Sequence, residues 1–284
     1  MNYQEYRAYK ESLNLNQYFR LDCMNPYKAM SFIQPVHYEV KKFGARKFIE
    51  KQIDYSGHFS FTKGVRAALK HLCQVYKERT LYLPNEVYPV YFDLADKLKV
   101  IPYSIFEQQD FIEVHDSMIL YTFNHFGSMK LTYSQAEELI ARGNLLIIDA
   151  IYDYENCLKD WHSLIKNGRC YILNSFSKNQ LCRDFGYVLH QSTIEFEAPG
   201  SYYEFDETVP HEQIQMFRTR WESIRTDYQG VIEQSRHPYF AVINLPFHKL
   251  LEQGILGVPL SVFAKYDAQE KTIVSCLYEI DRHL

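Results

Sequence analysis

The sequence lacks the features that mark membrane, secreted and nucleic-acid-binding chains. Its longest apolar runs, such as residues 145–151, are interrupted far short of the roughly 20 residues that cross a bilayer. The first residues are polar, without an apolar segment, so we expect no secretory signal. The net charge is only −4 and the basic residues are scattered, which argues against a nucleic-acid surface. We expect a cytoplasmic protein with neither membrane nor nucleic acid as partner.

Paired cysteines and clustered metal ligands are also missing. The six cysteines lie far apart and show no Cys-x-x-Cys spacing, which is typical of reduced thiols in the cytosol. No two of the 11 histidines lie three to five residues apart, so the sequence contains no local zinc motif and we predict no metal site. The 24 tyrosines and 19 phenylalanines are expected mostly in the core and indicate no function by themselves.

The middle of the chain alternates between strand and helix signals. Apolar and β-branched runs predict strands at residues 80–83, 118–123, 145–149, 170–176 and 185–189. Helical signals separate them, at residues 65–76 and 88–99 and after a capping box at residues 132–135 that leads to a stop at Gly143. This alternation predicts an α/β fold, with a mostly parallel sheet covered by helices.

The pattern changes after about residue 195, which predicts a second domain. A long amphipathic helix is expected at residues 211–234, followed by short strand-like segments at residues 239–245 and 273–278. We predict a large domain over residues 51–208 and a reduced α+β small domain over residues 209–284. Residues 1–50 are expected either to pack with the small domain or to wrap the large one.

Several residues that could carry chemistry follow predicted strands or open a helix. In parallel sheets, ligands bind beyond the carboxyl ends of the strands. Gly64 precedes a predicted helix, where it either forms a plain turn or contributes to an anion-binding site. Asp149 is the last residue of the most apolar predicted strand, and it could serve either as a helix cap or as a partner for a ligand. Lys178 follows another strand, as a surface lysine or as a partly buried amine that reacts with aldehydes.

Together these segments resemble the fold-type I pyridoxal 5′-phosphate enzymes. The closest likeness is to the class I/II aminotransferases, including the histidinol-phosphate aminotransferase group. The resemblance spans about residues 55–190 and extends weakly to residues 24–27 and 254–263. It is carried by five segments in order, at residues 62–69 (TKGVRAAL), 84–91 (PNEVYPVY), 124–127 (NHFG), 149–152 (DAIY) and 175–178 (SFSK).

The resemblance implies a role for each matching residue around the cofactor ring. Lys178 is similar to the lysine that forms the Schiff base with the cofactor. Asp149 is similar to the partner of the pyridinium nitrogen, whose protonation makes the ring an electron sink. Tyr152 and Asn124 resemble the two donors to the 3′-oxygen of the ring. Tyr88 is similar to the aromatic residue that stacks on the ring.

The resemblance also implies a phosphate site. Gly64 and Val65 resemble its backbone cradle, and Ser175 resembles the serine that adds a hydroxyl. Arg183 matches the phosphate arginine, which suits a phosphate bidentately. In the family this arginine lies further beyond the lysine, so the loop between Lys178 and Gly186 is shortened here.

Two further departures concern the rest of the site. The segment at residues 124–127 lacks the usual Asn-Pro pair of the family. The chain is short for the family, mainly in the small domain, where an arginine on a strand normally binds the substrate carboxylate. The matching stretch, residues 271–278, contains no arginine, and neither Lys271 nor Arg282 fits the motif.

The resemblance therefore implies an aminotransferase that moves an amino group from an amino donor to an oxo acid. Two alternatives stay open: another reaction on the same fold, such as decarboxylation or retro-aldol cleavage, and a non-catalytic scaffold. The family builds its site at a homodimer interface, so we expect a homodimer, with Tyr38 as a candidate contribution from the partner. The sequence does not identify the donor or the acceptor.

Overall fold

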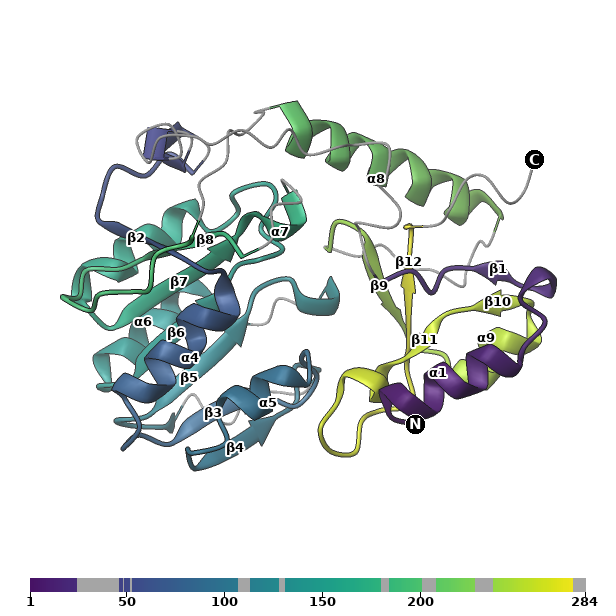
Figure 1. The fold of residues 1–284 in the computed structure, drawn as a ribbon, viewed down its shortest axis with the longest axis horizontal. Helices are drawn as coiled ribbons and strands as arrows, with labels where there is room; N and C mark the ends of the chain where they lie inside the picture. The colour runs from purple at the N-terminus through teal and green to yellow at the C-terminus, as the bar shows by residue number, and fades with distance from the viewer. Residues whose placement is uncertain are drawn as a thin grey trace.

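The computed structural model describes residues 1–24, 46–47, 49–51, 53–106, 113–127, 131–179, 184–200, 208–227 and 237–277. Its strands form a seven-stranded sheet, a three-stranded sheet and a two-stranded pair. Figure 1 shows the seven-stranded sheet and its helices on one side, and the two smaller sheets together on the other.

The central sheet has the strand order β2-β8-β7-β6-β5-β3-β4. Among the described strands, β8 pairs antiparallel with both β7 and β2, and every other pairing in this sheet is parallel. The predicted α/β fold with a mostly parallel sheet is therefore confirmed. The strands are β2 (Phe59–Thr62), β3 (Leu81–Pro84), β4 (Val100–Tyr103), β5 (Met118–Thr122), β6 (Leu145–Asp149), β7 (Cys170–Ser175) and β8 (Gly186–Leu189).

Helices cover both faces of this sheet, which explains its continuous apolar strands. All residues of β5, β6 and β7 are buried, as expected for parallel strands between two helical layers. In β6, Ile147 packs in the core with helices α4 (Val65–Val75) and α5 (Val90–Leu94). Leu146 and Ile148 point the opposite way, into the core with α6 (Tyr133–Ala141) and the 3-10 helix η4 (Lys159–Asn167).

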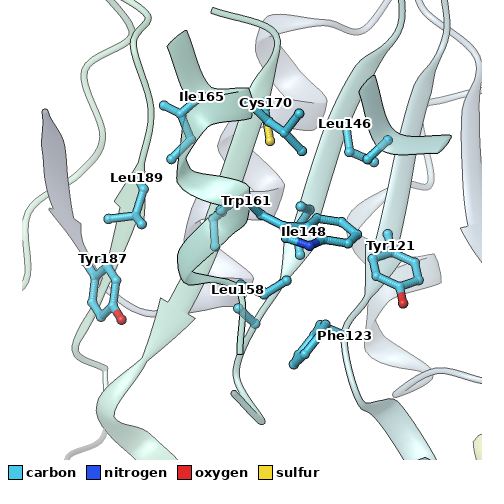
Figure 2. Close-up of a cluster of buried hydrophobic side chains, with 14 of the residues drawn as sticks. Tyr121, Phe123, Leu146, Ile148, Leu158, Trp161, Ile165, Cys170, Tyr187 and Leu189 are labelled. Atoms are coloured by element: carbon cyan, nitrogen blue, oxygen red, sulfur yellow. The ribbon is translucent and has the colours of Figure 1, made fainter. Parts of the chain in front are cut away.

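Aromatic side chains fill the core beneath η4. Figure 2 shows Trp161 of η4 lying among Ile148, Leu158 and Tyr121. The indole stacks on the Tyr121 ring, with 6.3 Å between ring centroids and 14° between planes. These contacts place a part of the abundant aromatic residues in the core.

The predicted capping box starts α6. The Thr132 hydroxyl oxygen accepts from the Gln135 amide at 3.3 Å, and the Gln135 side chain accepts from the Thr132 amide at 2.8 Å. Gly143, with φ of +86°, follows the helix in the left-handed region that glycine adopts without strain. This helix thus begins and ends where the sequence predicts.

The remaining elements form a second core. Strand β1 (Phe19–Arg20) pairs in parallel with β10 (Ile255–Leu256), so N-terminal residues lie against C-terminal ones. The domain boundaries stay a prediction. The other elements there are α1 (Tyr3–Ser12), η1 (Leu15–Gln17), β9 (Phe240–Ile243), α9 (Phe247–Glu252), β11 (Val258–Pro259), η5 (Leu260–Phe263) and β12 (Thr272–Ser275). Strands β11, β12 and β9 pair antiparallel in that order.

One long helix, α8 (Thr208–Asp227), lies along both parts of the molecule (Figure 1). It contacts the short helix α7 (Phe176–Asn179), which directly follows β7 of the central sheet. Phe217, Trp221 and Ile224 of α8 are buried in the second core. Residues 228–234 of the predicted helix lie outside the described part. None of the described helices is long and apolar enough to span a bilayer.

Three features of the sheet differ from the prediction. Strand β2 is not among the predicted strands. The helix predicted at residues 88–99 shortens to α5, because the chain leaves helical geometry at Ala95 and must turn back to start β4 at Val100. Strand β4 itself was not predicted. It contains Pro102, which cannot donate to a ladder and is tolerated because β4 is the edge strand.

Gly186, the first residue of β8, permits the close approach of three segments. It pairs with Thr62 of β2 and Ser175 of β7. A Cβ at this position would lie 2.4 Å from the backbone oxygen of Asn174 and 2.9 Å from the Cα of Gly64. No rotamer change relieves contacts with backbone atoms, so a larger residue must push the strands or the start of α4 apart.

We therefore predict that Gly186→Ala lowers the free energy of unfolding by about 1–3 kcal/mol, the usual range for overpacking. The matched control is Gly200→Ala, because a Cβ at exposed Gly200 meets nothing within 4 Å. That control should stay within about 0.5 kcal/mol of wild type. Urea unfolding of the three proteins measures both values, and equal stabilities for the two variants would contradict the packing argument.

Candidate active site

The chemically interesting residues meet at one edge of the central sheet. Asp149 is the last residue of β6 and Ser175 is the last of β7. Asn124 follows β5, and Gly64 follows β2. Because these strands are parallel, their carboxyl ends lie at the same edge, which is where ligands bind in such sheets.

Asp149 is a buried carboxylate with defined partners. The residue is only 1% exposed. Its Oδ2 accepts from the Tyr91 hydroxyl at 2.7 Å, and its Oδ1 accepts from the Ile151 amide at 3.1 Å. Burial raises the pKa of Asp149 to about 6, while the two hydrogen bonds and the charge of Lys178 oppose that rise. Asp149 is therefore ionised at neutral pH but close to its titration range.

Lys178 lies in α7, directly after β7, and is half-buried. Burial lowers the pKa of its amine to about 8. The carboxylate of Asp149 opposes this shift, and the positive charge of Arg66 adds to it. At pH 8 roughly half of the amine is neutral, against about 0.4% for an ordinary lysine, so Lys178 can act as a nucleophile or as a base.

Tyr152 lies in the turn after β6, between the two parts of the molecule. Its ring centroid lies 5.4 Å from that of His125 and 4.3 Å from that of His237. Burial raises the pKa of the phenol, and the charge of Asp149 raises it further, so the hydroxyl stays protonated and able to donate. Asn124 is buried, and it lines the same cavity as Tyr152.

The start of α4 is a helix N-terminus, which favours anions. Gly64 is its N-cap, with φ of +90°, and provides no side-chain cap for the first helical amides. Val65 follows as the first helical residue. The Ser175 hydroxyl is adjacent, because its oxygen would lie 3.7 Å from a Cβ at Gly64. That hydroxyl donates to the Phe185 carbonyl at 3.1 Å, so it must exchange this partner to donate to an anion.

Tyr88 precedes α5 and, among the predicted cofactor residues that the structure describes, is the most exposed, at 49%. Its phenol contributes to the raised pKa of Tyr152, which places the two side chains in the same neighbourhood. Arg183 and Tyr38 lie outside the described residues. The roles of all the predicted site residues stay predictions.

Sequence reasoning missed four residues that surround this site. Tyr91 lies three positions after Tyr88 and reaches Asp149, but its spacing indicated only a helix face. Arg66 is the second residue of α4 and adds to the local positive charge. His125 and His237 are buried, and their pKa values are lowered, first by burial and then by neighbouring charge that includes Lys178. No local sequence pattern indicated these contacts, because they join distant segments.

Solved structures resemble the chain over most of its length. Aspartate aminotransferase from Thermotoga maritima matches with a TM-score of 0.67 and 16% identity, over 98% of this chain and 93% of the other. An Escherichia coli protein with a methionine aminotransferase function matches with a TM-score of 0.65 and 13% identity, over 96% and 92%. A candidate pyridoxal-phosphate-dependent β-cystathionase from Corynebacterium diphtheriae matches with a TM-score of 0.63 and 11% identity, over 90% and 85%.

Neither a protein-family model nor a curated protein sequence matches this chain. At 11–16% identity the structural likeness establishes the fold alone. The chain therefore has the fold-type I architecture that the sequence motifs predicted.

The charges around Lys178 predict the pH dependence of its reactivity. In the apoprotein, trace acetylation of Lys178 should accelerate up to about pH 8 and then level off, because its pKa is lowered to about 8. Acetylation of ordinary exposed lysines should keep accelerating towards their pKa of about 10.4.

Since the Asp149 carboxylate raises the pKa of Lys178, Asp149→Asn should move the plateau below pH 8. Peptide mass spectrometry after labelling measures both curves. A plateau near pH 10, or an upward shift in Asp149→Asn, would show the burial argument to be wrong.

Proposed function

We propose that this chain is a pyridoxal-5′-phosphate-dependent aminotransferase, which moves an amino group from an amino acid or amine to an oxo acid. The observation that carries the proposal is the pairing of two oppositely perturbed groups at one sheet edge. Asp149 is a buried carboxylate of raised pKa, and Lys178 is a half-buried amine of lowered pKa. Such pairs concentrate at catalytic sites.

The residues fit this cofactor at each of its polar groups. Each Asp149 oxygen accepts one hydrogen bond among the described residues, and a carboxylate has about four acceptor sites, which leaves capacity for a ring N–H. The glycine cap and the uncapped amides of α4 suit a phosphate, and Arg66 adds a positive charge there. Tyr152, protonated at neutral pH, and Asn124 can donate to a ring oxygen.

When bound, the cofactor would supply an aldehyde for amine exchange and a ring that accepts electrons from the substrate Cα. Asp149 would keep the ring nitrogen protonated by holding a negative charge beside it. Lys178 would first hold the aldehyde carbon and, once released by the substrate amine, would accept the Cα proton and deliver it to the former aldehyde carbon. Tyr152 would orient the ring oxygen, and the start of α4 would fix the phosphate so that the reacting atoms stay aligned.

Further features extend this proposal. We place the chain with the class I/II aminotransferases, whose motifs match SFSK and DAIY, without choosing the histidinol-phosphate type. We also propose a cytoplasmic homodimer with a large domain over residues 51–208 and a reduced small domain over residues 209–284. The substrates would be a small-molecule amino donor and an oxo acceptor.

A second candidate function is another reaction of the same cofactor, such as a lyase reaction. Two observations support a lyase reaction. One is the structural match to a candidate β-cystathionase, and the other is the lack of an arginine in β12. The two functions share Lys178 and Asp149, so these residues do not separate them. Conversion of the bound cofactor to its amine form by an amino donor, with restoration by an oxo acid, identifies the aminotransferase.

The experiment that tests the function is reductive trapping. Purified protein loaded with pyridoxal 5′-phosphate should show a near-visible absorbance band that borohydride removes, with the adduct on Lys178 by peptide mass mapping. Lys178→Ala should lose the band and lose turnover, because the substitution removes the amine that is proposed to bond the aldehyde. Wild-type turnover in Lys178→Ala, or an adduct on a different lysine, would contradict the assignment.

The hydrogen bond from Tyr91 predicts a pH effect on cofactor binding. Because this bond lowers the pKa of Asp149, Tyr91→Phe should raise that pKa above its present value of about 6. Cofactor affinity, which needs the ionised carboxylate, should then begin to fall at a higher pH in Tyr91→Phe than in wild type. Equilibrium titrations between pH 5 and 8 measure this, and the comparison cancels ionisation of the cofactor itself. Identical pH profiles would contradict the proposed link.

A further inference from the structure

Tyr152 borders an open cavity, so its hydroxyl needs support to point in one direction. The cavity has a volume of about 810 Å³, and its wall includes Asn124, Tyr152 and His237 together with residues of α8. Tyr152 is only half-buried, so its side chain has room on the cavity side. A tyrosine beside open space can change its χ1 rotamer, which swings the hydroxyl away. Donation to one ring oxygen therefore requires that neighbouring side chains hold the phenol in place.

His237 makes a close ring contact with Tyr152. The aromatic rings near Tyr152 include those of His125, His237, Tyr239 and Phe240. Of these, His237 is the nearest, with 4.3 Å between centroids and 60° between planes. The other three centroids lie 5.4 Å, 5.8 Å and 6.0 Å away. Three of the four rings belong to the start of β9, so the second core supplies most of this contact.

The imidazole of His237 is itself firmly held. Its Nδ1 accepts from the backbone amides of Tyr239 at 3.2 Å and Phe240 at 2.9 Å. Its ring stacks on that of Phe240, with 4.4 Å between centroids and 19° between planes. The residue is only 2% exposed. Because two backbone groups at the start of β9 fix its orientation, His237 gives the phenol of Tyr152 a rigid neighbour.

The same two hydrogen bonds set the protonation of His237. An Nδ1 that accepts hydrogen bonds carries no proton, so the neutral ring carries its proton on Nε2. A second proton would place an N–H against two backbone N–H groups and break both bonds. Burial also lowers the pKa of His237, and the charges of His125 and Lys178 lower it further. The ring thus stays neutral and adds no positive charge near the reacting amine.

A second imidazole, His125, approaches Tyr152 from the central sheet. It lies in the turn after β5, between Asn124 and Phe126, whose φ angles of +55° and +52° are in the left-handed region. Such conformations cost free energy in residues other than glycine and cluster at functional sites. Phe126 compensates by its burial in the second core. Burial lowers the pKa of His125 to about 3, and the charge of Lys178 adds to this shift, so His125 is neutral too.

We propose that His237 is a positioning residue that keeps the Tyr152 hydroxyl aimed at the ring oxygen of the cofactor. This inference rests on the proposed function. The uncharged imidazole fills space beside the phenol, and the start of β9 fixes the imidazole. His237 would therefore act on the cofactor through Tyr152.

The pH dependence of the cofactor band reports the position of this hydroxyl. In loaded protein, the nitrogen bonded to the cofactor shares a proton with the ring oxygen, and loss of that proton changes the near-visible band. A hydroxyl that donates to the oxygen stabilises its negative charge and so lowers the pH midpoint of the change. Tyr152→Phe should therefore raise the midpoint.

His237→Asn is the informative variant. The asparagine oxygen can replace Nδ1 as acceptor for the two backbone amides, so the start of β9 is kept while the ring beside Tyr152 is lost. We expect the midpoint to rise by about 0.5–1 pH unit, the scale of one hydrogen bond. In the Tyr152→Phe background the same substitution should leave the midpoint unchanged, because the hydroxyl that His237 positions is absent. A purely structural role would give the same shift in both backgrounds.

His190 provides the matched control. It is buried, and its two ring nitrogens lie 2.9 Å from the hydroxyls of Ser60 and Ser192. It follows the end of β8, whose first residue, Gly186, pairs with Ser175 at the site edge, so His190 lies towards the opposite edge of the sheet. His190→Asn should leave the midpoint within about 0.2 pH unit of wild type, because distant sites do not couple.

A second measurement needs neither a substitution nor the cofactor. In wild-type protein labelled with ¹⁵N in histidine, NMR should show that His237 has an unprotonated Nδ1 and a protonated Nε2 between pH 6 and 8. This is the tautomer that the two backbone hydrogen bonds require.

The inference is overturned if His237→Asn leaves the midpoint unchanged, if it shifts the midpoint equally with and without the Tyr152 hydroxyl, or if His190→Asn shifts it as much. A proton on Nδ1 of His237 would also overturn it. Failure of the proposed function looks different, because wild-type protein would then show no band and no adduct on Lys178. The inference would fall with that function, whereas a normal wild-type band with unchanged midpoints would refute the inference alone.

Discussion

The constraint on which the rest of the site depends is the burial of Asp149. A carboxylate at the end of the most apolar strand costs free energy unless it is compensated, and its pKa of about 6 records that cost. Its compensation comes from three separate segments: the Tyr91 hydroxyl after β3, the Ile151 amide after β6 and the positive charge of Lys178 after β7. Parallel strands with their carboxyl ends at one edge bring these segments together, so the fold itself places the charge and its partners.

The start of α4 adds positive charge close to Lys178. Gly64 leaves the first amides of the helix without a side-chain cap, and Arg66 adds a cation at a helix end that already favours anions. Lys178 loses affinity for its proton in this setting, partly because of Arg66. A buried carboxylate beside Lys178, with an uncapped helix start nearby, is an arrangement that a phosphate-bearing aldehyde with a protonated ring would complete.

The sequence predicted local structure well and spatial partners poorly. Strand β6 and the capped helix α6 follow from apolar runs, a capping box and a glycine, all of which are local signals. Asp149 and Lys178 were singled out because they follow strands and match known motifs. Tyr91, Arg66, His125 and His237 were missed because their relation to the site comes from packing between segments far apart in sequence. Strand β4 was missed because it contains Pro102, and proline argues against a strand. A proline is tolerated in an edge strand, but the edge position of β4 is known only from the assembled sheet.

The central claim is that the Asp149 carboxylate holds a protonated ring nitrogen, and this is most directly tested by nitrogen NMR. Protein would be loaded with pyridoxal 5′-phosphate labelled with ¹⁵N in the ring, and the ¹⁵N chemical shift followed from pH 6.5 to 9. The account predicts the shift of a protonated pyridine that stays constant in wild type and changes to that of the neutral ring in Asp149→Ala. A neutral-ring shift in wild type, or equal shifts in the two proteins, would contradict it.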